Sequence, residues 1–206
     1  THTSIYINSA RIHQHLMKGT FSEGLKLVPV IEKNLEEYAL YVDRHRILVF
    51  NYKIATLYFG AGQYESAIDY LQRIINGPMD LRIDLQCYAR LLHLMAHYEL
   101  GNYDIIESLT KSVYRFMAKM KNLTVVEEEM FRFLRHSFGV SPQKLKPELE
   151  KFLHKIKHLE KNRFETRSFA YLDVISWVES KVYGKSMGEI IFEKYKKSKK
   201  RKYKKS

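Results

Sequence analysis

The chain has 206 residues, of which 45% are hydrophobic, and it carries a formal net charge of +12. This length fits one large domain or two small ones with an ample core. A single cysteine, Cys87, excludes an intramolecular disulfide framework and fits a reducing compartment, so we expect a cytoplasmic location. No apolar run reaches the length of a transmembrane helix, and the N-terminal residues lack the basic start and apolar centre of a signal peptide.

The positive charge is concentrated at the C-terminal end of the sequence. Residues 194–206 hold nine Lys and Arg side chains and no acid, whereas the rest of the chain has 26 basic and 23 acidic side chains. We therefore predict an ordinary folded domain over residues 1–193 and a separate, basic and disordered tail over residues 194–206.

Helical signals begin near the N-terminus. A first helix is predicted over residues 4–18, followed by a glycine turn and a second helix to about residue 38. Thr20 and Glu23 have the spacing of a capping box at the start of the second helix. Pro29 lies inside it and predicts a kink.

The most regular stretch runs over residues 51–78. Apolar residues there fall at helical spacing on both sides of a glycine turn, which predicts two amphipathic helices. The small side chains of Ala55 and Ala67 allow the two helices to pack closely. Gly77 and Pro78 end the second helix, because proline lacks an N–H group and disfavours helix before it.

The pattern Ile54-Ala55-x-x-Tyr58-x-x-x-Gly62-x-Tyr64-x-x-Ala67-x-x-x-Leu71 resembles a tetratricopeptide repeat (TPR). The turn recurs as Gly19-x-Phe21 and Gly101-x-Tyr103, at spacings of 43 and 39 residues compared with about 34 in that family. The resemblance implies antiparallel helix pairs stacked as a right-handed solenoid.

Further helices complete the predicted all-α fold. A third pair is expected over residues 80–100 and 103–120. Thr124 and Glu127 form a capping box for a helix to about residue 138, and the sequence Ser141-Pro142 starts a helix to about residue 161. We therefore predict about nine or ten helices, with clear repeats over residues 4–122 and a degenerate hairpin over 123–161.

Residues 163–193 are predicted to close the solenoid as capping helices. The first of these, over residues 163–183, is rich in aromatic residues (Phe164, Phe169, Tyr171 and Trp177) and ends at Gly184. Ser186 and Glu189 open the last helix. The segment 169–193 resembles the closing part of uncharacterised bacterial TPR-like proteins, which brings no known activity.

Candidate chemical groups are sparse. His93 and His97 share a helical face, as do His154 and His158, but each pair lacks a third ligand in the sequence, and polar packing or solvent exposure is the favoured interpretation. Cys87 is interpreted as a small buried hydrophobe. No phosphate-binding loop, nucleophile elbow or dinucleotide fingerprint occurs. We therefore predict no catalytic residue, no metal and no cofactor.

The TPR resemblance places the first helix of each hairpin along a concave groove. A groove lined by aromatic and Met side chains suits an extended or helical peptide of a partner protein. The competing interpretation is that a C-terminal helix or a second copy of the chain fills the groove. The residues assigned to this groove are Tyr6, His13, Tyr52, Phe59, Tyr88, Met95 and Tyr98.

The basic tail supports an alternative function. Clustered Lys side chains bind the phosphates of nucleic acids without sequence preference, so a nucleic-acid-associated regulatory module is the second hypothesis. A solvated tail without function, and contact with an anionic membrane or an acidic protein, are the other interpretations. The residues that would make these contacts are Lys196, Lys197, Lys199, Lys200, Arg201 and Lys202.

Overall fold

The computed structural model describes residues 2–79, 82–162 and 166–203, and within these ranges it contains twelve helices and no strand. The protein is therefore all-α, as the sequence predicts. Asp80, where a helix was predicted to start, and the aromatic Phe164 lie outside the described residues. The helix count exceeds the expected nine or ten because two of the predicted helices are each divided in two.

The first division occurs near the N-terminus, where α1 (His2–Lys18) is followed by α2 (Phe21–Leu25) and α3 (Val28–Glu37). The prediction of one kinked helix over this region is wrong. Pro29 has no N–H group to bond the carbonyl four residues earlier, so the chain turns at Lys26 and Leu27. A new helix then begins with the proline in its first turn, where that N–H is not needed.

The predicted capping box at the start of α2 does not form. The side chain of Thr20 makes no cap hydrogen bond, and its Oγ1 instead lies 2.8 Å from Nδ1 of His15. The carboxylate of Glu23 turns to Lys26, whose Nζ lies 2.9 Å away. Spacing alone therefore misassigned this cap, because a closer side-chain partner competes for the threonine hydroxyl.

Two helical hairpins form the centre of the molecule: α4 (Arg44–Gly60) with α5 (Tyr64–Ile75), and α6 (Ile83–Glu99) with α7 (Tyr103–Lys119). Helices α4 and α6 carry apolar residues on most sides and are largely buried. Helices α5 and α7 are amphipathic and keep a polar face in solvent. Ala55 and Ala67 are fully buried, in agreement with their predicted packing role.

The turns after α1, α4 and α6 share one backbone geometry. Their glycines, Gly19, Gly62 and Gly101, have φ values of 69°, 77° and 72°, which only glycine adopts without strain. In each turn the next N–H donates to the carbonyl five residues earlier, which defines a Schellman motif. These bonds are 2.9 to 3.1 Å long and run from Thr20 to His15, from Gln63 to Tyr58 and from Asn102 to His97.

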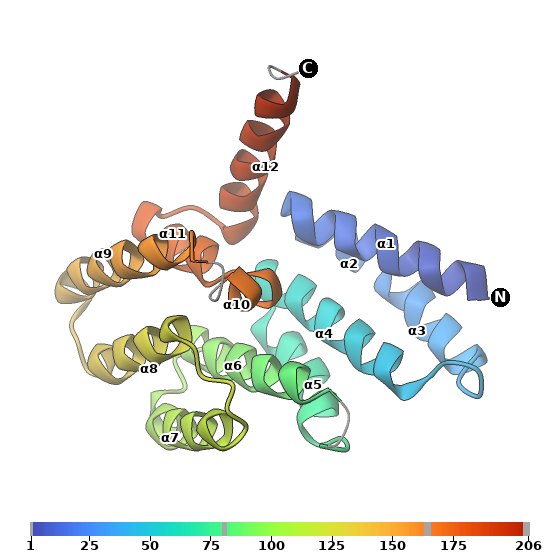
Figure 1. Ribbon diagram of the computed structural model, residues 1–206, viewed down its shortest axis with the longest axis horizontal. Helices are drawn as coiled ribbons and strands as arrows, with labels where there is room; N and C mark the ends of the chain where they lie inside the picture. The colour runs from blue at the N-terminus through green and yellow to red at the C-terminus, as the bar shows by residue number, and fades with distance from the viewer. Residues whose placement is uncertain (1, 80–81, 163–165, 204–206) are drawn as a thin grey trace.

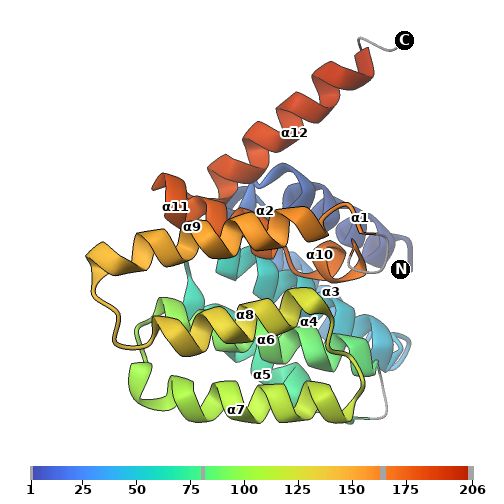
Figure 2. The same ribbon diagram turned by 60° about the vertical axis from the view of Figure 1, so that its left-hand side comes forward.

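The next hairpin consists of α8 (Val125–Ser137) and α9 (Pro142–Leu159). Its predicted capping box is confirmed, since the N–H of Thr124 donates to a carboxylate oxygen of Glu127 at 2.9 Å. Pro142 occupies the first turn of α9, also as predicted. Figure 2 shows α7, α8 and α9 as successive layers.

The C-terminal region contains α10 (Thr166–Tyr171), α11 (Val174–Tyr183) and α12 (Met187–Tyr203). The single helix predicted over residues 163–183 is divided because Asp173 caps a new helix, accepting bonds from N and Oγ of Ser176 at 2.9 and 2.6 Å. Gly184 ends α11 with a φ of 63°, as predicted. Ser186 and Glu189 cap α12, also as predicted, with the N–H of Ser186 donating to Glu189 at 2.7 Å.

The described part of the basic tail, which was predicted to be disordered, belongs to a helix in this structure. Helix α12 continues through Tyr203, because Lys and Arg are favourable helix formers and no Gly or Pro interrupts them. Figures 1 and 2 both show the C-terminal half of α12 standing away from the other helices.

Helix α12 also brings the C-terminal region into contact with the N-terminal helix. It packs against α11 and against α1, so that the last helix touches the first. The contact with α1 is made by backbone: a Cβ atom added at Gly188 would lie 2.7 Å from the carbonyl oxygen of Gly19. This crossing closes one side of the cavity described next.

Candidate binding cavity

Five of the seven residues assigned to the groove are buried. Tyr52, Phe59, Tyr88, Met95 and Tyr98 lie on α4 and α6 and are each at most 6% exposed. The two others, on α1, are exposed. The seven side chains therefore do not form one open groove.

The C-terminal segment of the chain covers much of the expected groove. The ring of Tyr171 stacks on that of Tyr88, with centroids 4.9 Å apart and planes within 7°. The hydroxyl of Tyr52 donates to the backbone oxygen of Tyr171 at 2.8 Å. This burial raises the pKa of the Tyr52 hydroxyl far above its usual range. Of the two interpretations left open by the sequence, coverage by the chain itself holds at these positions.

A second contact fixes α11 over the end of α6. The indole ring of Trp177 packs edge-on against Tyr98 at a centroid distance of 6.0 Å. The indole N–H donates to one carboxylate oxygen of Glu99, and Lys181 Nζ lies 2.8 Å from the other. The same helix, α11, therefore covers the aromatic side chain at the end of α6 and pairs with the charge of Glu99.

The uncovered part of this face is a cavity of about 710 Å³. Four of the seven predicted residues, His13, Tyr52, Phe59 and Met95, contribute to its walls. It is lined by residues of α1, α2, α4 and α6 on one side and of α10 and α12 on the other. The remaining lining is mainly apolar and includes Leu16, Phe21, Leu85, Leu92, Met187 and Ile191.

Two cationic side chains reach the cavity. Lys53 is half-buried, and its Nζ donates to Ser9 Oγ at 2.9 Å; burial lowers the pKa of this amine. Arg82 forms two bonds of 3.0 Å with the carboxylate of Asp84 and reaches the Tyr171 hydroxyl at 3.4 Å. The bonds with Asp84 raise the pKa of Arg82 and hold it at a left-handed φ of 54°.

Tyr6, assigned to the same groove, lies elsewhere. Its ring faces the guanidinium of Arg46 at 4.6 Å, and it lines a separate depression of about 240 Å³. The assignment of Tyr6 to one continuous groove with Tyr88 and Tyr98 is therefore wrong.

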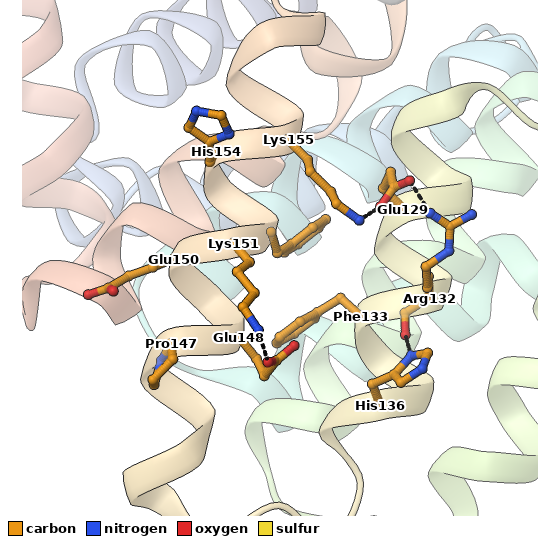
Figure 3. Close-up of a pocket in the computed structure, with 11 residues that line it drawn as sticks. Glu129, Arg132, Phe133, His136, Pro147, Glu148, Glu150, Lys151, His154 and Lys155 are labelled. Atoms are coloured by element: carbon orange, nitrogen blue, oxygen red, sulfur yellow. Dashed lines mark hydrogen bonds and ion pairs between the residues drawn. The ribbon is translucent and has the colours of Figure 1, made fainter.

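A second hollow of about 710 Å³ lies between α8 and α9 (Figure 3). The carboxylate of Glu129 bridges Arg132 and Lys155, and Lys151 pairs with Glu148 at 2.8 Å. The basic partners in these pairs are exposed, and the opposite charges neutralise one another, so the pairs contribute little to stability. We assign no binding role to this hollow.

The histidine pairs adopt similar geometries. The rings of His93 and His97 lie edge to face at 4.6 Å, and those of His154 and His158 at 4.7 Å. Within residues 2–79, 82–162 and 166–203, no group of three or more His, Cys, Asp or Glu is arranged to hold a metal ion. Cys87 is buried, as predicted, and burial raises the pKa of its thiol to about 11.

The five described residues assigned to the basic tail, Lys196, Lys197, Lys199, Lys200 and Arg201, are all exposed on α12. The side chain of Lys202 lies outside the described part. None of the helices in the described ranges has the length and apolar character needed to cross a membrane.

Sequence reasoning missed the partners of the groove residues. Tyr171 and Trp177 were recognised as aromatic members of a closing helix, but nothing in their spacing shows which face they cover. The Asp173-x-x-Ser176 cap was the one local signal that could have divided that helix.

Comparisons of the chain with protein-family models, with curated proteins and with solved structures returned no match.

Proposed function

We propose that this chain is a non-catalytic helical-repeat scaffold that binds an apolar segment of a partner protein or peptide in the cavity between α1, α4, α6 and the C-terminal helices. The observation that carries the proposal is the convergence of Tyr52, Phe59 and Met95 on one cavity of about 710 Å³. Aromatic and Met side chains adapt to varied apolar partners, and hollows of this size commonly hold ligands.

The architecture within this proposal is a TPR-like right-handed solenoid. Three equivalent Schellman turns and consecutive packed hairpins support it. Such scaffolds present the inner helices of their hairpins to a partner, and the inner helices here are α4 and α6. The single buried Cys87 is compatible with action in the cytoplasm.

A polypeptide is favoured as the occupant because the chain already places one against the adjoining surface. Tyr171 inserts its ring beside Tyr88 and offers its carbonyl to the Tyr52 hydroxyl. A partner segment would extend this mode of contact into the neighbouring cavity, with apolar side chains inside and its backbone near the polar groups at the rim.

The test fills the cavity by substitution. Thr56, which lines it, is changed to Trp, and both parent and variant are panned with a displayed library of twelve-residue peptides. We expect apolar-rich peptides selected on the parent to bind Thr56→Trp at least about tenfold more weakly, because the indole occupies their site.

The matched control is Ser108→Trp on the exposed face of α7. Both hydroxyls bond a carbonyl of their own helix, to Tyr52 from Thr56 and to Ile105 from Ser108, so the two changes remove similar local bonds. Equal binding of the selected peptides to both variants would overturn the proposal. So would a parent chain that dimerises and loses its dimer only in Thr56→Trp, because a second copy would then be the occupant.

A further inference from the structure

The projecting half of α12 differs from the rest of the described molecule in its uninterrupted run of basic and polar side chains. Lys194 still belongs to the body, since its Nζ lies 2.6 Å from Glu179. Tyr195 marks the last contact with α1, where Lys18 Nζ approaches its ring at 5.9 Å. From Lys196 to Tyr203 the helix extends about 12 Å, at about 1.5 Å per residue, away from the rest of the chain (Figure 1).

Positive charge covers more than half of the surface of this projecting segment. Successive residues of an α-helix are rotated by about 100°, so the exposed Lys196, Lys197 and Lys199 point in three different directions. Lys200 and Arg201 are also exposed, and the five charges together cover about 200° of the helix circumference. The sequence contains no acid after Glu193, which pairs with Lys185 at 2.7 Å.

The distribution of charge decides between partner classes. A membrane or the flat surface of an acidic protein contacts one side of a helix, and an interfacial helix also needs an apolar face opposite its charges. The segment from Lys196 to Arg201 has no such face. A helix whose charges cover more than half of its circumference is matched by a partner that offers anionic groups on two sides.

We propose that α12 inserts its basic half into the major groove of double-stranded DNA and binds the phosphates on both sides without sequence preference. The groove of B-form DNA is about 12 Å wide, and a helix with its side chains measures about 10–12 Å. The major groove of duplex RNA is deep and narrow, which excludes the helix. Lysines act here as point charges on phosphates, so they position the helix and read no bases.

The experiment measures binding of the full chain to two unrelated 20-base-pair DNA duplexes by fluorescence anisotropy between 50 and 200 mM KCl. With about five phosphate contacts, the logarithm of the binding constant is expected to fall with the logarithm of the salt concentration with a slope of about −4 to −5. The affinity is expected to drop about 500-fold over this range and to be equal for both sequences.

Replacing Lys196, Lys197, Lys199, Lys200 and Arg201 by Gln keeps good helix formers in α12 and removes five charges. We expect this variant to bind at least about 30-fold more weakly at 50 mM KCl, with an unchanged helical circular dichroism spectrum. The matched control removes five exposed charges from the body, and it should stay within about threefold of the parent: Lys33, Arg115, Lys119, Lys144 and Lys146 to Gln.

Equal losses in the two variants would overturn the proposal, because net charge rather than α12 would then explain the binding. A duplex RNA of equal length bound as tightly as DNA would exclude insertion into the major groove. Vesicles with 30% phosphatidylserine bound at 100 mM KCl, with no binding to DNA, would assign the helix to membranes. This proposal does not depend on what occupies the cavity, because the five basic side chains do not line it.

Discussion

His93 shows how the environment of a single residue changes its chemistry. This residue of α6 is partly buried, and its Nε2 is buried with no hydrogen-bond partner within the described part of the chain. Burial, the adjacent His97 and the nearby Arg90 lower the pKa of His93 to about 4. Protonation therefore places an uncompensated charge inside the helix packing.

Acid is expected to destabilise the protein through His93. Between pH 6.5 and pH 4 the unfolded chain binds a proton at this residue and the folded chain does not, so stability falls as the pH is lowered. From pH 7 to pH 5 the loss should reach up to about 2 kcal/mol in the free energy of unfolding, measured with urea. His93→Gln should reduce this dependence on pH.

His158 provides the matched control for this prediction. It forms the same edge-to-face pair with a histidine four residues away, but on the exposed face of α9. His158→Gln should leave the change between pH 7 and pH 5 as in the parent. Identical pH profiles for the parent and His93→Gln would show that His93 is not the acid-sensitive group.

At the scale of elements, α11 covers part of α6. Its Trp177 is 2% exposed and covers Tyr98, while its Lys181 neutralises Glu99 at the end of α6. The same helix packs on α9 and α12. The closing segment therefore contributes to the hydrophobic core itself.

Truncation of Trp177 should be costly. Trp177→Ala is expected to lower the free energy of unfolding by about 3–5 kcal/mol and to increase binding of an apolar dye, because it leaves a cavity beside Tyr98. Trp177→Phe keeps most of the packing and loses the N–H bond to Glu99, so about 1–3 kcal/mol is expected.

Urea unfolding followed by circular dichroism measures both effects. Phe192→Ala serves as the control, because Phe192 is an exposed aromatic side chain on α12 and its loss should cost less than about 1 kcal/mol. A cost for Trp177→Ala no larger than that of Phe192→Ala would contradict the packing of α11 on α6.

For the whole molecule, the contact between α1 and α12 connects the chain ends and encloses the cavity. The backbones of Gly19 and Gly188 approach each other so closely that neither accepts a Cβ atom without movement. Met187 and Ile191, on either side of Gly188, line the cavity next to this crossing. A shift of α12 at this crossing would therefore change both the size of the cavity and the direction of the basic half of α12.

Gly188→Ala tests this close crossing, because its effect on the free energy of unfolding should have the opposite sign from that in an ordinary helix. Alanine stabilises most helices by up to about 1 kcal/mol relative to glycine. Here the added Cβ meets the carbonyl oxygen of Gly19, so we expect a loss of about 1–3 kcal/mol in urea unfolding and faster amide hydrogen exchange in α12. Ser198→Ala, on the exposed part of the same helix, should change stability by no more than about 0.5 kcal/mol. A stabilised Gly188→Ala protein would be incompatible with the crossing.

The sequence by itself determined the helical class, most helix ends and the three glycine turns. Those features depend on neighbouring residues: a left-handed turn favours glycine, and the Thr124–Glu127 cap forms within one helical turn. Local rules failed where two signals competed, as at Thr20. They were also incomplete at Asp173, which divides the closing helix.

Only the tertiary structure decided what covers the inner face. Tyr52 and Tyr171 are 119 positions apart in the sequence, and no periodicity specifies their contact. The aromatic residues of α4 and α6 were predicted to face a groove, and the apolar face was covered by the chain's own C-terminal segment because exposure of so much apolar surface to water is unfavourable. The size of the remaining cavity and the direction of α12 follow from that packing. The packing depends on contacts between residues far apart in the chain, which local sequence patterns do not specify.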